Sequence, residues 1–133
     1  MRVDIPAAAK ALLYARVLWE LARYDLLFAC RGLQGVRPRR GQRAPLPRAS
    51  GVEWEAAICE TVQSVAPFYW KPIRCLQRSI VTARLMRNHG ILAEVVIGYR
   101  AAPFFSHAWV EVAGRVANDS PIYQRRLQVL ERL

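Results

Sequence analysis

The period of the hydrophobic pattern changes at residue 91, and this change constrains the fold more than any other feature of the sequence. Before residue 91, apolar side chains recur every three or four positions, which is typical of amphipathic helices. After it, they alternate over 91–99 and over 106–112, as in strands, with a turn at 101–103 between them. Helices followed by neighbouring strands predict an α+β fold.

The first predicted helix covers residues 6–31, and a basic stretch at 33–49 follows it. Pro6 suits the first turn of this helix, and Gly32 suits its exit. The apolar face of the helix consists of Ala11, Ala15, Leu18, Ala22, Leu26 and Ala29. Because prolines, glycines and arginines interrupt every period over 33–49, that stretch is predicted to be a loop or linker.

Two further helices are predicted before the sheet. The second begins at Ser50, which has capping-box spacing to Glu53, and it ends at Pro67. Its buried stripe consists of Trp54, Ile58, Val62 and Val65. The third helix covers 75–89 and stops at Gly90. It has an apolar stripe of Leu76, Ile80 and Ala83, beside a face of small side chains at Cys75, Ser79 and Thr82.

The chain beyond the second strand is predicted to turn at 113–115 and to form a short third strand at 116–119. The last stretch, 121–133, is predicted to be a short helix. Its inward-facing residues are expected to be Leu127, Leu130 and Leu133.

The net charge of +10 is concentrated in the first part of the chain, since residues 1–50 carry +7 and residues 51–133 carry +3. An arginine-rich region of this kind favours an acidic partner, namely nucleic acid, an anionic membrane or an acidic peptide. The alternative is a solvated basic face without a partner. No segment has the roughly 18 uncharged apolar residues that a membrane span needs.

The three cysteines, Cys30, Cys59 and Cys75, have no metal-binding spacing, and the sequence has only two histidines. We therefore expect neither a zinc site nor structural disulfides, and a cytoplasmic location suits such a chain. No cofactor is expected. Cys30 and Cys59 lie within apolar helical patterns and are expected to be core or chemically inert residues.

Cys75, His107 and Asp119 follow one another in the order nucleophile, base and orienting carboxylate, at spacings of 32 and 12 residues. Cys75 opens a helix, where the helix dipole and unpaired N–H groups stabilise a thiolate. Lys71 and Arg74 precede it and are expected to favour the thiolate too. The trio predicts a cysteine hydrolase in which His107 takes the thiol proton and Asp119 fixes the imidazole tautomer.

Each member of this trio has a structural alternative. A lone cysteine is commonly a small buried hydrophobe, and Asp119 follows Asn118 in a sequence that suits a turn. His89 stands at a helix end and is assigned a capping role, which leaves His107 for chemistry. A three-residue loop at 113–115 would put Asp119 on the face of His107, whereas a two-residue loop would separate them and exclude the triad.

A set of motifs runs through residues 75–119. It consists of Cys75-Leu76-Gln77-Arg78-Ser79, Gly90, Gly98, Pro103-Phe104, His107-Ala108-Trp109-Val110-Glu111, Gly114 and Asn118-Asp119. Together these motifs resemble the transglutaminase-like cysteine proteases of lasso-peptide biosynthesis, which are leader peptidases of the microcin J25-processing type. The resemblance implies a transglutaminase-like or papain-like core, with N-terminal helices ahead of it. In that core, a Cys-bearing helix packs on a small antiparallel sheet that carries His and Asp.

The resemblance also implies a domain organisation and a triad. Residues 1–49 would be an N-terminal basic helix and linker, and residues 50–133 would be the protease core. By the family pattern, Cys75, His107 and Asp119 are the catalytic triad.

The implied reaction is hydrolysis of the bond between the leader and the core of a ribosomally made precursor peptide. The family works with a separate small leader-binding protein and an ATP-dependent macrolactam synthetase. Because 133 residues leave no room for a fused leader-binding domain, that protein is expected to be a separate chain. The N-terminal half of the chain is expected to dock it.

Several residues are candidates for contact with the substrate. The Cys75 backbone N–H is the expected oxyanion donor, and Trp70 is a candidate second donor, although an aromatic core role suits it better. Arg78 is a candidate for steering an acidic leader, with a solvated helix face as the alternative. Trp109 and Glu111 share the His107 face and are candidates for shaping the cleft, although sheet packing is the commoner role of such a Trp.

Two other functions stay open. The same triad supports acyl transfer to an amine, as in a transglutaminase-type or amide-forming enzyme, and the acceptor decides between the two. The basic charge alone suggests a nucleic-acid-binding protein, although the sequence lacks an RNP motif or a zinc finger.

Overall fold

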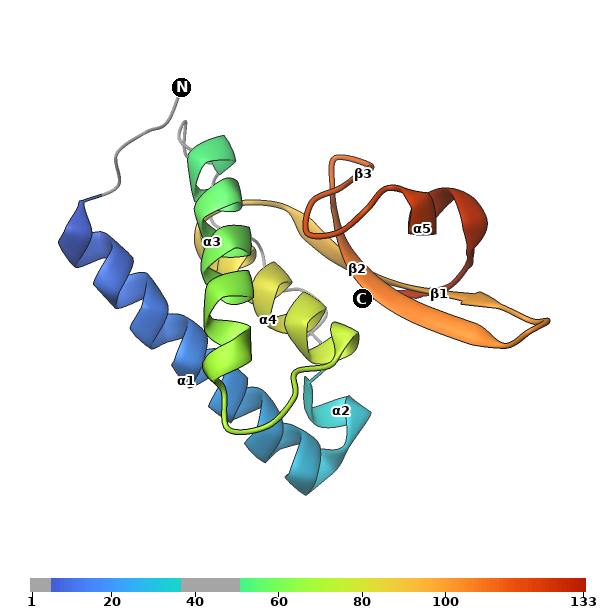
Figure 1. Cartoon of the computed structure of the whole chain (residues 1–133), viewed down its shortest axis with the longest axis horizontal. Helices are drawn as coiled ribbons and strands as arrows, with labels where there is room; N and C mark the ends of the chain where they lie inside the picture. Colours follow the sequence, from blue (N-terminus) through green and yellow to red (C-terminus); the bar gives the residue numbers. More distant parts are fainter. Residues whose placement is uncertain (1–5, 37–50) are drawn as a thin grey trace.

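The computed structural model describes residues 6–36 and 51–133, with side chains from Trp54 onward in the second range. The helices are α1 (Ala7–Arg31), α2 (Leu33–Val36), α3 (Gly51–Val65), α4 (Cys75–Asn88) and α5 (Ile122–Arg126), with a 3₁₀ turn η1 (Ala66–Phe68) after α3. The strands are β1 (Ala93–Arg100), β2 (Phe105–Val112), β3 (Arg115–Val116) and β4 (Gln128–Arg132). Figure 1 shows α1, α3 and α4 on one side of the molecule and the sheet with α5 on the other. The predicted α+β class is therefore confirmed.

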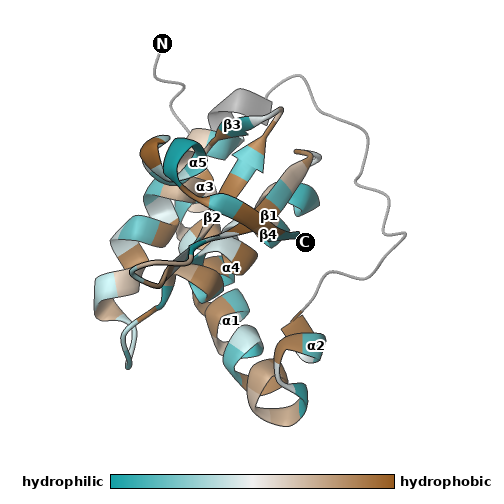
Figure 2. Ribbon diagram, turned by 90° about the vertical axis from the view of Figure 1, so that its right-hand side faces the viewer, coloured by the Kyte–Doolittle hydropathy of each residue, from teal (hydrophilic) through white to brown (hydrophobic). Residues whose placement is uncertain are grey.

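The four strands form one antiparallel sheet in the order β3-β2-β1-β4, and Figure 2 shows β2, β1 and β4 side by side. β1 and β2 pair along their whole lengths, with Val95 opposite Val110. Ala113 and Gly114 join β2 to β3, and their φ angles of 51° and 77° suit a two-residue hairpin turn of the I′ type. The two long strands that the alternation predicts are confirmed, with small shifts at their ends.

α4 is the central element, because it contacts α1 and α3 on one side and β1 and β2 on the other. Its buried residues are Gln77, Ser79, Ile80, Val81, Thr82, Ala83, Leu85 and Met86. A helix that is covered on most sides needs apolar or small side chains there, which is what these positions supply. Burial of Ile80 and Ala83 confirms two of the predicted core positions, while Leu76 is only partly buried. In the described ranges, 6–36 and 51–133, no helix is long and apolar enough to cross a membrane.

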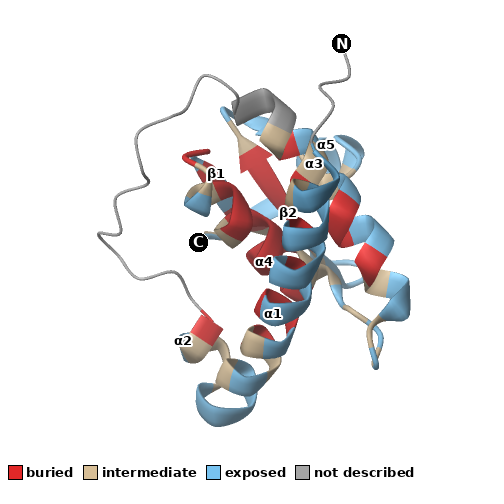
Figure 3. Cartoon of the chain, turned by 90° about the vertical axis from the view of Figure 1, so that its left-hand side faces the viewer, coloured by how far each residue is buried: buried red, intermediate tan, exposed pale blue. Residues whose placement is uncertain are grey.

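α1 buries a different face from the one that the sequence predicts. Its core residues are Leu13, Val17, Leu21 and Tyr24. The predicted apolar face, from Ala11 to Ala29, is exposed along its length (Figure 3). Because both faces are apolar, periodicity alone does not choose between them. The buried face has the larger side chains, so its burial removes more apolar surface from water.

The predicted stripe of α3 is confirmed at its last three positions, Ile58, Val62 and Val65. The predicted capping box of Ser50 and Glu53 lies outside the described side chains, and so do residues 37–49 of the predicted linker. Residues 33–36, which the sequence assigns to that linker, form the short helix α2 instead.

The prediction of one helix over 121–133 is wrong in its second half. There the chain turns into the edge strand β4 and pairs with β1. The Leu133 N–H donates to the Val95 carbonyl at 2.8 Å, and the Val95 N–H donates back at 3.1 Å. Leu130, predicted to face inward, is 65% exposed. Pairing with a strand about 30 residues earlier is a long-range contact, which local periodicity does not detect.

Candidate active site

His107 and Asp119 form a direct hydrogen bond. His107 Nε2 donates to Asp119 Oδ2 over 2.7 Å, and the two side chains are 16% and 25% exposed. In a neutral imidazole, this contact leaves Nδ1 as the basic nitrogen. The carboxylate thus fixes the ring tautomer in the way that the predicted triad requires.

Asp119 reaches His107 by a different route from the predicted one. The β2–β3 loop has two residues, and a regular ladder with that loop would put Asp119 on the opposite face. However, β3 already ends at Val116, and the following residues bend out of the strand. In this bend, Asn118 Oδ1 accepts the Val110 N–H at 2.7 Å. Here a side chain replaces the main chain in the ladder. The loop is thus the two-residue alternative, and the expectation that this alternative separates Asp119 from His107 is wrong, because the pair forms.

Cys75 is the first residue of α4 and is partly buried. Arg74 is the N-cap and makes no side-chain capping bond. The first bond that closes a turn runs from the Arg78 N–H to the Arg74 carbonyl at 3.0 Å. The N–H groups of residues 75–77 therefore have no partner within the helix. Together with the helix dipole, they make this end of α4 suited to a thiolate and to an oxyanion.

Ser79 connects α4 to the segment that carries Asp119. Asn118, which directly precedes Asp119, donates from Nδ2 to Ser79 Oγ over 3.5 Å. Cys75 lies one turn before Ser79 on the same side of the helix, about 6 Å away. The structure thus brings the helix start and the His107–Asp119 pair to adjacent elements. Among the described residues, no hydrogen bond joins Cys75 to His107.

Asp25 of α1 anchors the connector that leads into α4. Its carboxylate accepts hydrogen bonds from the Tyr69 hydroxyl and, at 3.2 Å, from Gln77 Nε2, and it forms an ion pair with Lys71. These contacts fix the position at which α4 begins. Because Asp25 balances the charge of Lys71, Lys71 supports a Cys75 thiolate less than the sequence predicts.

Aromatic rings surround His107. Tyr123 of α5 lies closest, with ring centroids 4.1 Å apart, and Phe105 and Trp109 follow at 6.2 and 6.4 Å. Such contacts restrict the orientation of the imidazole. Sequence reasoning missed Tyr123, because it lies in a segment predicted only to pack, and no motif marks it.

Trp109 and Glu111 lie on the His107 face as predicted, but both are buried. Trp109 has no exposed surface, and the Glu111 side chain is 3% exposed. Glu111 accepts hydrogen bonds from Trp109 Nε1 at 3.2 Å, Gln124 Nε2 at 2.8 Å and Arg132 at 2.7 Å. Burial raises the pKa of Glu111, but the three donors, with Arg132 foremost, outweigh it and bring the pKa below its usual value. These contacts favour packing over a role in the cleft.

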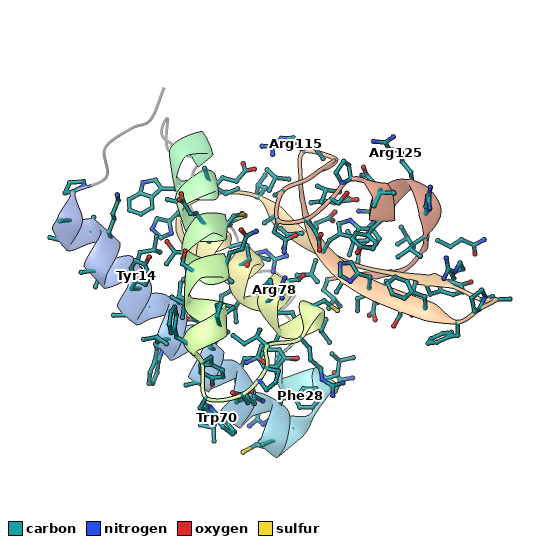
Figure 4. All side chains as sticks on the ribbon, viewed as in Figure 1. Tyr14, Phe28, Trp70, Arg78, Arg115 and Arg125 are labelled. Carbon is teal, nitrogen blue, oxygen red and sulfur yellow. The ribbon has the colours of Figure 1, made fainter. Side chains whose placement is uncertain are left out.

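Arg78 and Trp70 have very different surroundings (Figure 4). Arg78 lies one turn after Cys75, and its Nε is buried without a hydrogen-bond partner among the described residues. A buried donor without a partner is costly, but an atom that solvent cannot reach is not open to substrate either, so the contact of Arg78 with substrate stays a prediction. Trp70 is 79% exposed on the connector and contacts Tyr69 and Lys71, so it is not a core residue. Its role as an oxyanion donor stays a prediction.

The remaining cysteines and the second histidine lie outside this site. Cys59 is partly buried and donates to the Ala117 carbonyl at 3.6 Å, and burial raises its pKa to about 11. Cys30 is exposed on α1, so it is not a core residue. His89 caps α4 as predicted, because Nδ1 donates to the Leu85 carbonyl at 2.8 Å. Within 6–36 and 51–133, no group of three or more His, Cys, Asp or Glu side chains is arranged to hold a metal ion.

The family of this fold is identified by comparison with known proteins. The model of the family described as the transglutaminase-like superfamily matches residues 11–132. The chain belongs to the transglutaminase-like superfamily. The matched range runs from α1 to β4, so this transglutaminase-like domain includes the N-terminal helix as well as the sheet.

One curated relative has a more specific name. The chain is 45% identical over 56 residues to the Microcin J25-processing protein McjB of Escherichia coli. The aligned part is 42% of this chain and spans only 27% of that protein. No solved structure matches the chain. The family resemblance that the motifs indicate is therefore confirmed over part of the chain.

Proposed function

We propose that this chain is a cysteine peptidase that removes the leader from a lasso-type precursor peptide. The 2.7 Å hydrogen bond between His107 and Asp119 carries the proposal, because a histidine oriented by a carboxylate is the base that a thiol nucleophile needs. Cys75 supplies that thiol at the start of the adjacent helix. Membership of the transglutaminase-like superfamily and the similarity to a Microcin J25-processing protein support the same function.

In the proposed reaction, His107 Nδ1 takes the proton of the Cys75 thiol, and the thiolate attacks the carbonyl carbon of the scissile peptide bond. The free N–H groups at the start of α4 stabilise the resulting oxyanion. His107 then gives the proton to the leaving amine, which releases the core peptide and leaves the leader as a thioester on Cys75. Water, deprotonated by His107, hydrolyses the thioester and restores the thiol. Asp119 stabilises the imidazolium in both steps.

The proposal includes two partners besides the precursor. A separate leader-binding protein would deliver the precursor, and a macrolactam synthetase would use the released core. The net charge of +10 suits an acidic leader, and Arg78, one turn after Cys75, is the candidate contact. We place this reaction in the cytoplasm.

Acyl transfer to an amine is the second candidate function, because the superfamily to which the chain belongs is described by its likeness to transglutaminases. Both reactions pass through the same thioester on Cys75. The acceptor, water or an amine, is what distinguishes them.

Mass spectrometry of a candidate precursor, incubated with its leader-binding protein, tests the proposal. We expect wild-type protein and the control Cys30→Ser to cut at the leader–core junction, and Cys75→Ala to leave the precursor intact. Cys30 is a matched control because it is an exposed cysteine outside the site. Cleavage by Cys75→Ala would remove Cys75 from the mechanism. A product joined to an added primary amine, formed in preference to the free acid, would favour acyl transfer.

A further inference from the structure

One short segment of the chain contacts the imidazole of His107 on two sides. At one edge of the ring, Asp119 accepts the hydrogen bond from His107 Nε2 at 2.7 Å. Four residues later, Tyr123 of α5 lies against the face of the same ring, with ring centroids 4.1 Å apart and ring planes tilted by 33°. We call residues 119–123 the clamp segment. Its two contacts leave Nδ1 of the imidazole outside the hydrogen bond with the carboxylate.

The neighbouring strand provides no side chain that would hold this ring. The residue opposite His107 on β1 is Gly98, and directly opposed residues share a face of the sheet. The space above Gly98 is occupied by Trp109, whose Cη2 would lie 2.5 Å from a Cβ added there. Along β2, the rings of Phe105 and Trp109 have their centroids 6.2 and 6.4 Å from that of His107. Tyr123 therefore supplies the closest ring contact to the imidazole.

α5 holds Tyr123 in place through the residues that follow it. Gln124 donates from Nε2 to Glu111 Oε1 at 2.8 Å and to the Gly114 carbonyl at 2.9 Å. The second acceptor is a main-chain carbonyl, so this anchor does not depend on the Glu111 carboxylate alone. Leu127, the C-cap of α5, is buried, and its N–H donates to the Tyr123 carbonyl at 3.0 Å. Because the next residue and the end of the helix are both held, the ring of Tyr123 is fixed relative to β2.

The other end of the clamp segment is held as well. Asn118, which directly precedes it, accepts the Val110 N–H at 2.7 Å. Asp119 Oδ1 accepts the Ser120 N–H at 2.8 Å, so the carboxylate is oriented by its own turn while Oδ2 binds His107. A hydrogen bond alone would allow the imidazole to tilt about it. A second contact on the face of the ring removes that freedom and restricts both side-chain torsions.

We propose that Tyr123 is a positioning residue of the active site. Its ring holds the imidazole of His107 so that Nδ1 stays directed to the Cys75 thiol, and it covers the His107–Asp119 hydrogen bond from water. The reaction that this positioning serves rests on the proposed function, whereas the placement of the ring is a property of the protein alone. The contact is made by the two rings, so phenylalanine should replace tyrosine here.

Kinetics of precursor cleavage test the effect of the ring. Tyr123→Phe keeps the ring, and Tyr123→Leu removes it while filling much of the same volume. We expect Tyr123→Phe to match wild type, and Tyr123→Leu to lower kcat by about 10- to 100-fold at an unchanged KM, because a misplaced base slows the chemical step. Tyr123→Met, which also lacks a ring, repeats the test with a different shape. Ile122→Ala is the matched control, since Ile122 is the neighbouring residue of α5 and is 41% exposed. It should leave both constants unchanged.

Nuclear magnetic resonance of the protein alone tests the position of the imidazole. The proton that His107 Nε2 donates to Asp119 should give a resolved N–H signal, because a covered hydrogen bond exchanges slowly with water. The chain has two histidines, so the variant His89→Gln identifies which signal belongs to His107. We expect this signal to persist in Tyr123→Phe and Ile122→Ala, and to broaden or vanish in Tyr123→Leu.

The unfolding midpoint of each variant is measured beside these quantities. A wild-type kcat and N–H signal in folded Tyr123→Leu would overturn the inference. So would a raised KM at unchanged kcat, which would make Tyr123 a substrate contact, or a kcat that falls only in proportion to the unfolded fraction. A ring-dependent N–H signal without cleavage by wild type would sink only the proposed function. Cleavage by wild type with an unchanged kcat in Tyr123→Leu would sink only this inference.

Discussion

One face of β2 carries two polar clusters, and they differ in burial. At one end, the His107–Asp119 pair is 16% and 25% exposed, and one imidazole nitrogen is left without a bond in the pair. At the other end, Glu111 is 3% exposed and accepts hydrogen bonds from three donors. A buried and fully satisfied network contributes to stability, whereas a partly exposed pair with a free basic nitrogen can take part in chemistry. On the same face of β2, Glu111 thus serves the stability of the fold, whereas His107 is available for the proposed function.

The substitution Asp119→Asn should break the partly exposed His107–Asp119 pair and have the largest effect on activity. The neutral amide would neither fix the imidazole tautomer nor stabilise the imidazolium, so kcat for leader cleavage should fall by roughly 10³-fold or more. The unfolding midpoint should change little, because the pair is partly exposed. Cleavage kinetics and thermal unfolding of the same preparation measure both quantities. A variant with wild-type kcat would show that the pair serves only the fold.

The substitution Glu111→Gln should break the buried cluster and act mainly on stability. It removes the charge that holds Arg132 and weakens three hydrogen bonds, so the free energy of unfolding at pH 7 should fall by about 2–3 kcal/mol. Urea unfolding measures this change. Values of kcat at low temperature, where the variant is folded, should stay close to wild type. A large fall in kcat without loss of stability would contradict the division between the two clusters.

The same variant has a pH signature. The pKa of folded Glu111 is lowered from its ordinary value of 4.5, so its contribution to stability is present above pH 4.5. It is lost as the pH falls through the lower pKa of the folded protein. The difference in stability between wild type and Glu111→Gln should therefore be constant near neutral pH and should shrink below pH 4.5. A difference that grows towards acid would have the wrong sign.

The substitution Gly98→Ala should displace Trp109, which lies between the two clusters on β2. We expect its effect to be the smallest of these substitutions. A Cβ at Gly98 would lie 2.5 Å from Trp109 Cη2 and 3.0 Å from Leu127 Cβ, so the indole must shift. We expect a loss of about 1–2 kcal/mol of stability and a modest fall in kcat, because Trp109 contacts both His107 and Glu111. In the Trp109→Phe background, Gly98→Ala should cost less stability than it does in the wild-type protein, because the smaller ring leaves room for the added Cβ. Additive losses in the double variant would argue against a clash.

The candidate site was predictable as a set of residues, but not as a geometry. The order and spacing of Cys75, His107 and Asp119 can be read from the sequence without knowing the path of the backbone between them. The hairpin argument that linked Asp119 to His107 was wrong, because it assumed a regular ladder. The bend after β3 depends on Asn118 bonding to Val110 and to Ser79, and Ser79 lies on a helix 39 residues earlier.

The sequence by itself determined the α+β class, the position of Cys75 at a helix start and the alternation that puts His107 and Glu111 on one face of a strand. These follow from local periods of 3.6 and 2, which neighbouring residues set. Tertiary structure decided which face of α1 is buried, that the C-terminal segment pairs with β1 as a strand, and that Glu111 is buried while His107 stays partly exposed. Each of these depends on surface contributed by distant parts of the chain. Burial is a property of the whole packed molecule, so local sequence leaves it open wherever two faces of an element are both apolar.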